Sequence, residues 1–288
     1  MKHALVFGGS GQIGLPLLQR LYHDGWRVTA ISRGEQTDRP GLHWLRGDLE
    51  RMPELPKRVD AIFSCGPLLK FAKWYETSGI EASRVVGFGS TSAETKRGSA
   101  DAEERRVAAE LREGEATLFA AAQPRSDAAT VLRPTLIYGA GRDATLTRIA
   151  QLAQRLRYFP LPRGANGLRQ PVHVDDLADA AFAALTAPAS FGNTYAVPGG
   201  ETLSYRDMVA RTLACLRPPV KLIELPSPLF NLALLAAQAS GRATGLGEAA
   251  VRRMRSDMAF DAGPAQRDFG YAPRPFRPSA QMFESPRG

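Results

Sequence analysis

The stretch ALVFGGSGQIG, residues 4–14, joins an apolar run to three glycines, Gly8, Gly11 and Gly14, that stand three residues apart. Residues 12–23 follow with apolar side chains at helical spacing. The first glycine permits a tight turn, the second lets the backbone approach a pyrophosphate, and the third lets the helix pack closely on the strand. Unpaired N–H groups at the start of the helix favour an anion there. This turn is therefore predicted to bind a dinucleotide through Gly8, Ser10, Gly11, Gln12, Ile13 and Gly14.

The rest of the chain continues the alternation of short β-rich runs with helical segments. Strands are predicted at 4–8, 27–32, 43–46, 60–65, 84–90, 129–138 and 194–197, and helices at 12–23, 101–123 and 175–186. The strands lack polar alternation, as expected when helices cover both faces of a sheet. The pattern predicts an α/β fold, a Rossmann-like doubly wound parallel sheet with a small C-terminal substrate lobe. The sheet is expected in residues 1–140 plus 172–198, and the lobe in residues 141–171 plus 199–288.

Composition limits the class of protein. The chain has 288 residues, of which 44% are hydrophobic, and this is enough for a large core. Two cysteines and four scattered histidines provide neither a disulfide framework nor a metal site. The apolar run 229–237 is shorter than the roughly 20 residues of a membrane span, and no signal peptide is recognised at the start. A cytoplasmic protein without membrane contact is expected, with 229–239 as a buried helix or a partner surface.

The formal net charge is +8. The arginines are spread along the chain without a nucleic-acid-binding motif, so an Arg-rich surface is favoured and no nucleic-acid partner is expected. The expected partner is a small-molecule substrate of anionic character, and both a monomer and a homodimer remain open. Arg142, Arg163 and Arg169 lie in loops of the expected lobe, where guanidinium groups suit an anionic ligand. The alternative for each of them is a solvated surface position.

The end of the second predicted strand indicates which dinucleotide binds. An NAD site places a carboxylate there, which accepts a hydrogen bond from the ribose 2′-hydroxyl. This chain has Ser32 and Arg33 instead, a hydroxyl and a guanidinium that suit a 2′-phosphate. NADP(H) is therefore predicted, while the nearby Glu35 leaves NAD as the less favoured cofactor; Arg33 as a solvated strand-end residue is the alternative. Asp48, after the third strand, is expected to accept a hydrogen bond from the adenine amino group, to cap a helix at 51–55, or both.

Five segments resemble one protein family. They are GGSGQIG at 8–14, GDL at 47–49, LRPTLIYG at 132–139, PVHVDDLA at 171–178 and FGYAP at 269–273. With these segments the chain resembles the extended short-chain dehydrogenases/reductases, the group of the NAD(P)-dependent epimerases and dehydratases. The resemblance implies that Leu49 lies with Asp48 under the adenine and that Pro134 lies beside the nicotinamide. It also implies a structural role for His173.

The catalytic residues of that family are where this chain departs from it. The family uses a Tyr and a Lys four residues apart on one helical face, with a Ser or Thr ahead of them. The resemblance places Thr91, with Ser92 as the near alternative, at the hydroxyl position. Counted from Glu110, Arg106 falls at the Lys position and Ala102 at the Tyr position. The usual proton donor is therefore absent.

Arg106 can donate hydrogen bonds to a ribose, but its charge never titrates. Its alternative interpretation is an exposed arginine paired with Glu110. Tyr75 supplies a phenol from another segment, although packing is favoured for it. Two functions follow: an NADP(H)-binding oxidoreductase or epimerase-type enzyme that lacks the usual Tyr, or a non-catalytic NADP(H)-binding sensor or assembly factor. The loops on the substrate side are intact, so the enzyme is narrowly favoured.

Overall fold

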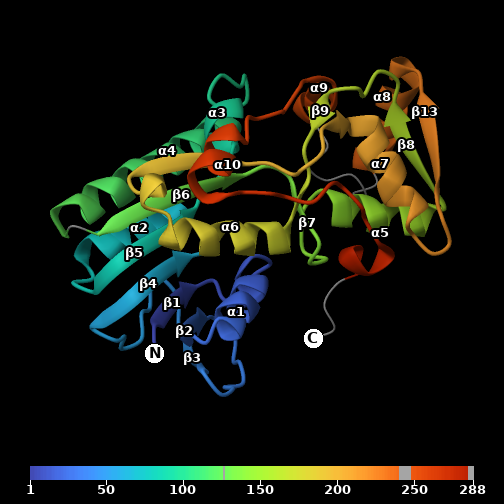
Figure 1. Cartoon of the computed structure of the whole chain (residues 1–288). Coiled ribbons are helices and arrows are strands. Elements are labelled where there is room, and N and C mark those ends of the chain that lie inside the picture. Colours follow the sequence, from blue (N-terminus) through green and yellow to red (C-terminus); the bar gives the residue numbers. More distant parts are fainter. Residues whose placement is uncertain (126, 240–247, 285–288) are drawn as a thin grey trace. The chain divides into compact units, whose positions relative to one another are not determined.

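The computed structural model describes residues 1–125, 127–239 and 248–284. The chain divides into two compact units (Figure 1). The first unit comprises residues 1–135, 174–198 and 261–273, and the second comprises residues 136–173, 199–260 and 274–288. Each unit is organised around its own cluster of buried apolar side chains.

The first unit is built on seven parallel strands in the order β11-β6-β5-β4-β1-β2-β3. The strands are β1 His3–Phe7, β2 Arg27–Ser32, β3 Leu42–Arg46, β4 Arg58–Ser64, β5 Glu81–Phe88, β6 Ala128–Pro134 and β11 Asn193–Val197. The order runs outward from β1 in both directions, which is the doubly wound topology of dinucleotide-binding sheets. The predicted fold class is confirmed.

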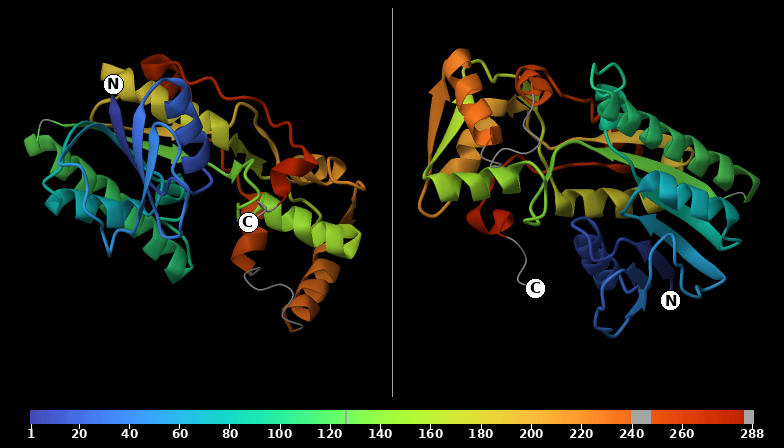
Figure 2. Two further views of the ribbon diagram at one scale, coloured as in Figure 1. Left: turned by 90° about the horizontal axis from the view of Figure 1, so that it is seen from below. Right: turned by 180° about the vertical axis from the view of Figure 1, so that it is seen from behind.

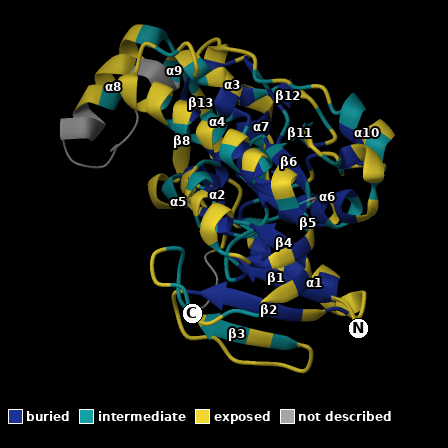
Figure 3. Cartoon of the chain, turned by 90° about the vertical axis from the view of Figure 1, so that its left-hand side faces the viewer, coloured by how far each residue is buried: buried dark blue, intermediate teal, exposed yellow. Residues whose placement is uncertain are grey.

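Helices cover both faces of this sheet. Helix α1 (Gly14–His23) packs against α6 (Val174–Thr186), and α2 (Leu68–Thr77) packs against α4 (Ala102–Ala122), with one pair on each face (Figure 2). Strand β1 is buried along its whole length, and β2 is buried beyond its first residue (Figure 3). Burial from both sides explains why these strands show no alternation of polar and apolar residues.

The predicted strand 129–138 is divided in the structure. Strand β6 ends at Pro134, and Ile137–Tyr138 forms a separate strand, β7, which pairs with β10 (Val172–His173) in the second unit. Proline has no N–H group with which to continue the ladder, and Gly139 follows β7 with a φ of 115°. The expected boundary at residue 140 is therefore too late, because the chain already enters the second unit at Leu136.

The segment 261–273 is also placed differently from the expectation, which assigned all of 199–288 to the lobe. It carries helix α10 (Gly263–Phe269) and lies in the first unit. The Tyr271 hydroxyl donates to the carbonyl of Pro198 at 2.6 Å, and the Tyr195 hydroxyl donates to Asp268 at 2.5 Å. Hydrogen bonds from two buried phenols thus hold this segment beside β11, the strand at one edge of the sheet.

The second unit combines helices with three two-stranded ladders. Its helices are α5 Leu146–Leu156, α7 Tyr205–Ala214, α8 Ser227–Ala239 and α9 Glu248–Arg255. Besides β7 with β10, the ladders pair β8 (Tyr158–Pro162) with β13 (Lys221–Leu225) and β9 (Leu168–Arg169) with β12 (Leu203–Ser204). Helix α5 buries Leu146, Ile149 and Ala153 at helical spacing in the core of this unit. No helix among the described residues has the length and apolarity needed to cross a membrane.

Helix α8 is not a buried helix along its described side chains. Phe230 is buried, but Leu229, Leu232 and Leu235 are 55%, 66% and 63% exposed. Their spacing of three residues aligns them along one side of the helix. The expectation of a buried helix at 229–239 is therefore wrong for these positions, and the alternative, a partner surface, stays a prediction.

Charge is divided unequally between the two units. The second unit contains 17 Lys and Arg residues and 7 Asp and Glu residues, a net +10, whereas the first contains 20 and 22, a net −2. The arginines are spread along the chain, as the sequence shows, but the excess of positive charge is not. All of the net charge of +8 comes from the second unit.

Candidate functional site

The Gly-rich turn after β1 requires glycine at its first and third positions. Gly8 has a φ of 72°, and a Cβ there would lie 3.1 Å from the carbonyl carbon of Cys65. A Cβ on Gly14 would lie 2.2 Å from the carbonyl oxygen of Gly8 and 2.7 Å from that of Gly9. The backbone can take this path only without side chains at these two places. The tight turn and the close packing of helix on strand are thus both present.

The outer side of the same turn presents polar groups. The amide of Gly11 donates to the Gly8 carbonyl at 2.9 Å, whereas the amides of Gln12, Ile13 and Gly14 donate to no backbone carbonyl of the described residues. The Gln12 Oε1 atom is buried and has no hydrogen-bond partner among those residues. Amides at a helix start suit a pyrophosphate, and an orphaned acceptor suits a ribose hydroxyl. These groups fit a dinucleotide.

The carboxyl end of β2 lies beside this turn and beside the GDL segment. The hydroxyls of Ser10 and Ser32 are 3.1 Å apart, and the amide of Gly47 donates to the Ser32 carbonyl at 2.9 Å. Arg33 is exposed. Arg33 follows β2 and Asp48 follows the neighbouring parallel strand β3, so both lie at the same edge of the sheet. A hydroxyl, a guanidinium and a carboxylate gather at this edge of the sheet.

Asp48 caps a turn but no helix. Its Oδ1 atom accepts hydrogen bonds from the amides of Arg51 and Glu50 at 2.8 and 2.9 Å, and these bonds hold the pKa of the carboxyl below its usual range. The predicted helix 51–55 is absent from this described stretch. Leu49 packs against the core of the first unit. Contact of either residue with an adenine stays a prediction.

Strand β3 and the end of β4 contribute groups that the sequence did not single out. The Trp44 ring lies so close to the turn that a Cβ on Gly9 would be 3.2 Å from it. The Ser64 hydroxyl, at the end of β4, is buried without a partner among the described residues. Burial raises the pKa of the neighbouring Cys65 thiol to about 12, so it is protonated at neutral pH. Cys65 is therefore no thiolate nucleophile.

The hydroxyl residues after β5 are held by the backbone. Thr91 is buried, and its Oγ1 donates to the carbonyl of Pro134 at 3.2 Å. The amide of Ser92 donates to the Oγ of Ser90 at 3.1 Å. Ser92 begins the short helix α3 (Ser92–Thr95) and is half-buried. The hydrogen bond between Thr91 and the Pro134 carbonyl thus connects the residues after β5 with the LRP segment.

Arg106 lies on the solvent side of α4. Its guanidinium forms ion pairs with Glu103 and Glu110, and 59% of its side chain is exposed. Ala102, one turn earlier, is exposed as well. The catalytic role expected for Arg106 is not supported by this placement. The alternative, an exposed arginine paired with Glu110, describes what the structure contains.

A different glutamate connects α4 with the LRP segment. Arg133 donates from Nε to Oε1 of the buried Glu115 at 2.7 Å. Glu115 also lies against Gly89, where β5 ends. Because Arg133 belongs to a segment that carries the family resemblance, Glu115 offers a second reference for the helix beside Glu110. The same offsets of four and eight residues then put Leu111 at the Lys position and Val107 at the Tyr position.

The two references select residues that differ in burial. Val107 and Leu111 are partly buried, unlike Ala102 and Arg106. Neither carries a proton donor. Tyr75 does not replace one, because it is fully buried and its hydroxyl donates to Asp127. Burial and this bond raise the pKa of the phenol above its usual range, which confirms the packing interpretation of Tyr75.

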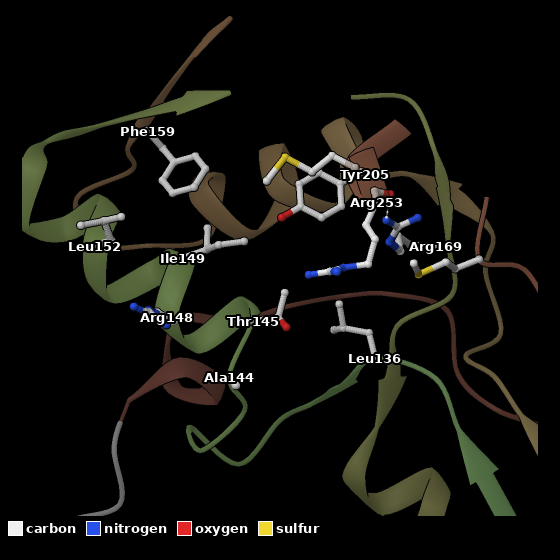
Figure 4. A pocket seen from close by; sticks show the side chains of 12 residues that line it. Leu136, Ala144, Thr145, Arg148, Ile149, Leu152, Phe159, Arg169, Tyr205 and Arg253 are labelled. Carbon is white, nitrogen blue, oxygen red and sulfur yellow. Dashed lines mark hydrogen bonds between the residues drawn. The ribbon is translucent and has the colours of Figure 1, made fainter. Parts of the chain in front are cut away.

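The second unit contains a cavity of about 280 Å³ (Figure 4). Arg169 lines the cavity, and 5% of the residue is exposed. Its Nη1 atom donates to the carbonyls of Leu168 and Ser256 at 2.6 and 2.8 Å. Its Nη2 atom donates to the carbonyl of Arg253. Arg142 is exposed and does not line this cavity. The cavity is lined by Leu136, Ala144, Thr145, Arg148, Ile149, Leu152, Phe159, Arg169, Tyr205, Arg253, Met254 and Met258.

His173 has the structural role expected for it. A Cβ on Gly139 would lie 2.5 Å from the His173 Nε2 atom, so the ring packs directly on the backbone. Tyr138 meets the same ring edge to face at 5.1 Å and meets Phe276 at 4.9 Å. These rings belong to the core of the second unit.

Comparisons with known proteins agree with this architecture. No family model matches the chain. Over an alignment of 315 residues, it is 26% identical to 2-alkyl-3-oxoalkanoate reductase of Stenotrophomonas maltophilia (strain K279a). The alignment covers 94% of each chain. The chain is 25% identical over 178 residues to UDP-glucose 4-epimerase of Vibrio cholerae, covering 59% of this chain and 51% of that one.

Solved structures show the same fold. UDP-glucuronic acid 4-epimerase from Bacillus cereus in complex with NAD matches with a TM-score of 0.72 at 13% identity, over 98% of this chain and 94% of that one. The Bordetella bronchiseptica enzyme WbmF in complex with NAD⁺ and UDP matches with a TM-score of 0.69 at 17% identity, over 98% and 90%. At 13% and 17% identity these structures show the fold alone, and together with the relatives named above they agree with the resemblance to the extended short-chain dehydrogenases/reductases.

Proposed function

We propose that this protein is an NADP(H)-dependent oxidoreductase of the epimerase/reductase type, acting on a small-molecule substrate. The observation that carries the proposal is the turn after β1. It excludes side chains at Gly8 and Gly14, and it offers three helix-start amides and the orphaned Gln12 Oε1 to a ligand. Such a turn binds the pyrophosphate of a dinucleotide. Gly8, Ser10, Gly11, Gln12, Ile13 and Gly14 would hold the pyrophosphate and its ribose.

NADP(H) is proposed over NAD because of the residues at the end of β2. Ser32 and Arg33 offer a hydroxyl and a charged guanidinium, which form strong hydrogen bonds with a 2′-phosphate. No carboxylate stands at the end of this strand, and Glu35 is exposed two residues beyond Arg33. Asp48 and Leu49 would face the adenine, and Pro134 the nicotinamide. The solved neighbours named above are NAD complexes, so this preference distinguishes the chain from them.

A bound nicotinamide would supply or accept the hydride, and the chain would orient the substrate. Thr91 or Ser92 would hold the reacting oxygen through a hydroxyl. Val107 and Leu111, at the positions of the usual Tyr and Lys, supply no proton. A general acid typically contributes about 10²–10⁴-fold to the rate, so turnover is expected to be slow. The full-length likeness to a reductase favours carbonyl reduction over sugar-nucleotide epimerisation.

The test is a fluorescence titration of the purified protein with NADPH and NADH, followed by incubation of the NADPH complex with a series of small oxo acids and ketones. We expect tighter binding of NADPH than of NADH and slow oxidation of NADPH by at least one carbonyl compound. Absence of binding to either cofactor would overturn the proposal. Normal binding without oxidation by any compound would instead support the non-catalytic sensor or assembly factor.

A further inference from the structure

Helix α8 presents apolar side chains to solvent as well as to the core. Phe230 is buried, whereas Leu229, Leu232 and Leu235, here called the leucine row, are each more than half exposed. Figure 3 shows the exposed positions of α8 in yellow, beside α9. The leucine row extends about 9 Å along the helix axis. An apolar stripe on the outer side of a helix marks a surface that another apolar body covers.

The sequence around α8 separates apolar residues from charged ones. Residues 225–241 contain no charged side chain. The flanking stretches 217–224 and 242–255 together contain six Lys and Arg residues and two Glu residues. A surface helix of a globular protein usually has charged and polar residues on the face that points away from the core. Helix α8 therefore has the composition of a helix that leaves water, and its flanks are cationic.

Two exposed arginines lie at the N-terminal end of α8. The Nη2 atom of Arg255 donates to the Oγ atom of Ser227 at 2.8 Å and to the carbonyl of Arg163 at 3.4 Å. The amide of Arg163 donates to the carbonyl of Leu225 at 2.9 Å. The N-terminus of a helix carries a positive partial charge, so a cation there does not stabilise the helix. Positive charge and the leucine row thus adjoin each other on one face of the second unit.

Charge decides which kind of surface fits this face. Glu224, on β13, forms an ion pair with Arg206, and the second unit as a whole has a net charge of +10. A second copy of the chain would bring like charges together, which opposes association. A protein partner is usually held by aromatic and arginine anchors, whereas the leucine row is aliphatic. A bilayer with anionic lipids supplies both an apolar interior and negative headgroups.

We propose that α8 lies in the surface of a membrane that contains anionic lipids, with the leucine row among the acyl chains and Arg163 and Arg255 at the headgroups. The inference goes beyond the proposed function and does not depend on it. It replaces the expectation of no membrane contact, which rested on the length of the run 229–237 and on a buried helix. The helix lies along the membrane, since no helix of the described residues is long and apolar enough to cross it.

Cosedimentation of the full chain with lipid vesicles tests the proposal. One set of vesicles contains phosphatidylcholine alone, and the other contains phosphatidylcholine mixed with phosphatidylglycerol. We expect the mixed, anionic vesicles to bind at least about tenfold more tightly than the neutral ones. Leu232→Ser with Leu235→Ser should weaken binding to the mixed vesicles at least about tenfold, because two aliphatic side chains no longer enter the acyl region. Tyr22→Ser is the matched control, since Tyr22 is 58% exposed on α1 of the first unit, and it should leave the affinity unchanged.

Arg163→Gln tests the charge separately, because it leaves the leucine row in place. The affinity for the mixed vesicles should fall about fivefold, the effect of one basic residue near an anionic surface. Arg39→Gln makes the same change at an exposed residue of the first unit and should have no effect. Equal affinity of the two kinds of vesicle for the wild type would overturn the proposal.

The thermal midpoint of each variant shows whether it is folded. Equal affinity of the wild type and of a folded leucine double variant for the mixed vesicles would also overturn the proposal. Sedimentation velocity without vesicles identifies a different occupant of the leucine row. We expect the wild type and the double variant to have the same oligomeric state. A wild-type dimer that the double variant loses would assign the leucine row to a second copy of the chain and overturn the membrane proposal.

Discussion

The two units of this protein are specified by their sequences in different ways. In the first unit, one local stretch, residues 4–14, determines a turn that only glycine can form at two positions. In the second unit, Arg169 and Arg253 both line the cavity, although they lie 84 positions apart in the sequence. The first unit presents backbone amides to a ligand, whereas the second presents side chains. A local motif can bind a ligand that many proteins share. A ligand that is specific to one protein needs contacts between residues that only the tertiary structure brings together.

The largest effect that separates the units is expected for Gly14→Val. Its Cβ would lie 2.2 Å from the Gly8 carbonyl oxygen, so the turn must change. Overpacking of this kind costs about 1–3 kcal/mol. We expect NADPH affinity to fall by more than about a hundredfold, or ~2.7 kcal/mol. Gly98→Ala is the control, since a Cβ there meets nothing within 4 Å. Normal NADPH affinity in a folded Gly14→Val protein would show that the Gly-rich turn does not bind the dinucleotide.

The register of α4 counted from Glu115 provides the next largest effect. Val107→Tyr with Leu111→Lys rebuilds a Tyr and a Lys at the spacing of the family, on the partly buried side of the helix. A general acid contributes about 10²–10⁴-fold, so a poorly fitted pair should still raise the rate of NADPH oxidation at least about tenfold. Ala102→Tyr with Arg106→Lys is the matched control on the exposed side, and it should give no gain. A gain in the control alone would restore Glu110 as the reference for the alignment.

Arg33→Asp sharpens the assignment of the cofactor. A carboxylate at the end of β2 repels a 2′-phosphate and accepts a hydrogen bond from a 2′-hydroxyl. We expect the preference for NADPH over NADH to fall by about tenfold to a hundredfold, in line with one charge-assisted contact. Arg39→Asp makes the same change of charge away from the strand end and should keep the preference. If wild-type protein binds NADH more tightly, the assignment to NADP(H) is wrong.

The smallest effect is expected for Arg106→Ala. Its ion pairs with Glu103 and Glu110 are exposed to solvent, and exposed pairs contribute little to stability. We expect no measurable change in NADPH affinity or in the rate of NADPH oxidation, measured together with the thermal midpoint. A loss of cofactor binding would show that Arg106 acts in the first unit after all, against its placement on the solvent side.

Sequence reasoning reached the first unit because its signals are local. Residues 4–14 and the apolar strands needed no knowledge of distant contacts, and β2 occupies the predicted 27–32. For α4 it did not separate Glu110 from Glu115, because both lie on one helix and they differ in burial beside Arg133. Sequence spacing says which residues share a helical face, but not which face meets the sheet.

The second unit was less accessible to such reasoning. Arg253 has no motif around it, and its carbonyl accepts a hydrogen bond from the distant Arg169. The segment 261–273 was expected in the lobe, because nothing in its composition shows that Tyr271 binds Pro198. The hydrogen bonds that place both segments connect residues that are far apart in the chain. Periodicity and composition carry no information about such pairs.

The unequal division of charge affects the rate at which anionic molecules associate with the protein. An anionic small molecule that diffuses toward the second unit is attracted by its net charge of +10. Long-range attraction accelerates encounter and weakens as the Debye length shortens, from about 10 Å at 0.1 M ionic strength to about 3 Å at 1 M. The association rate of an acid with the second unit should therefore fall steeply with added salt.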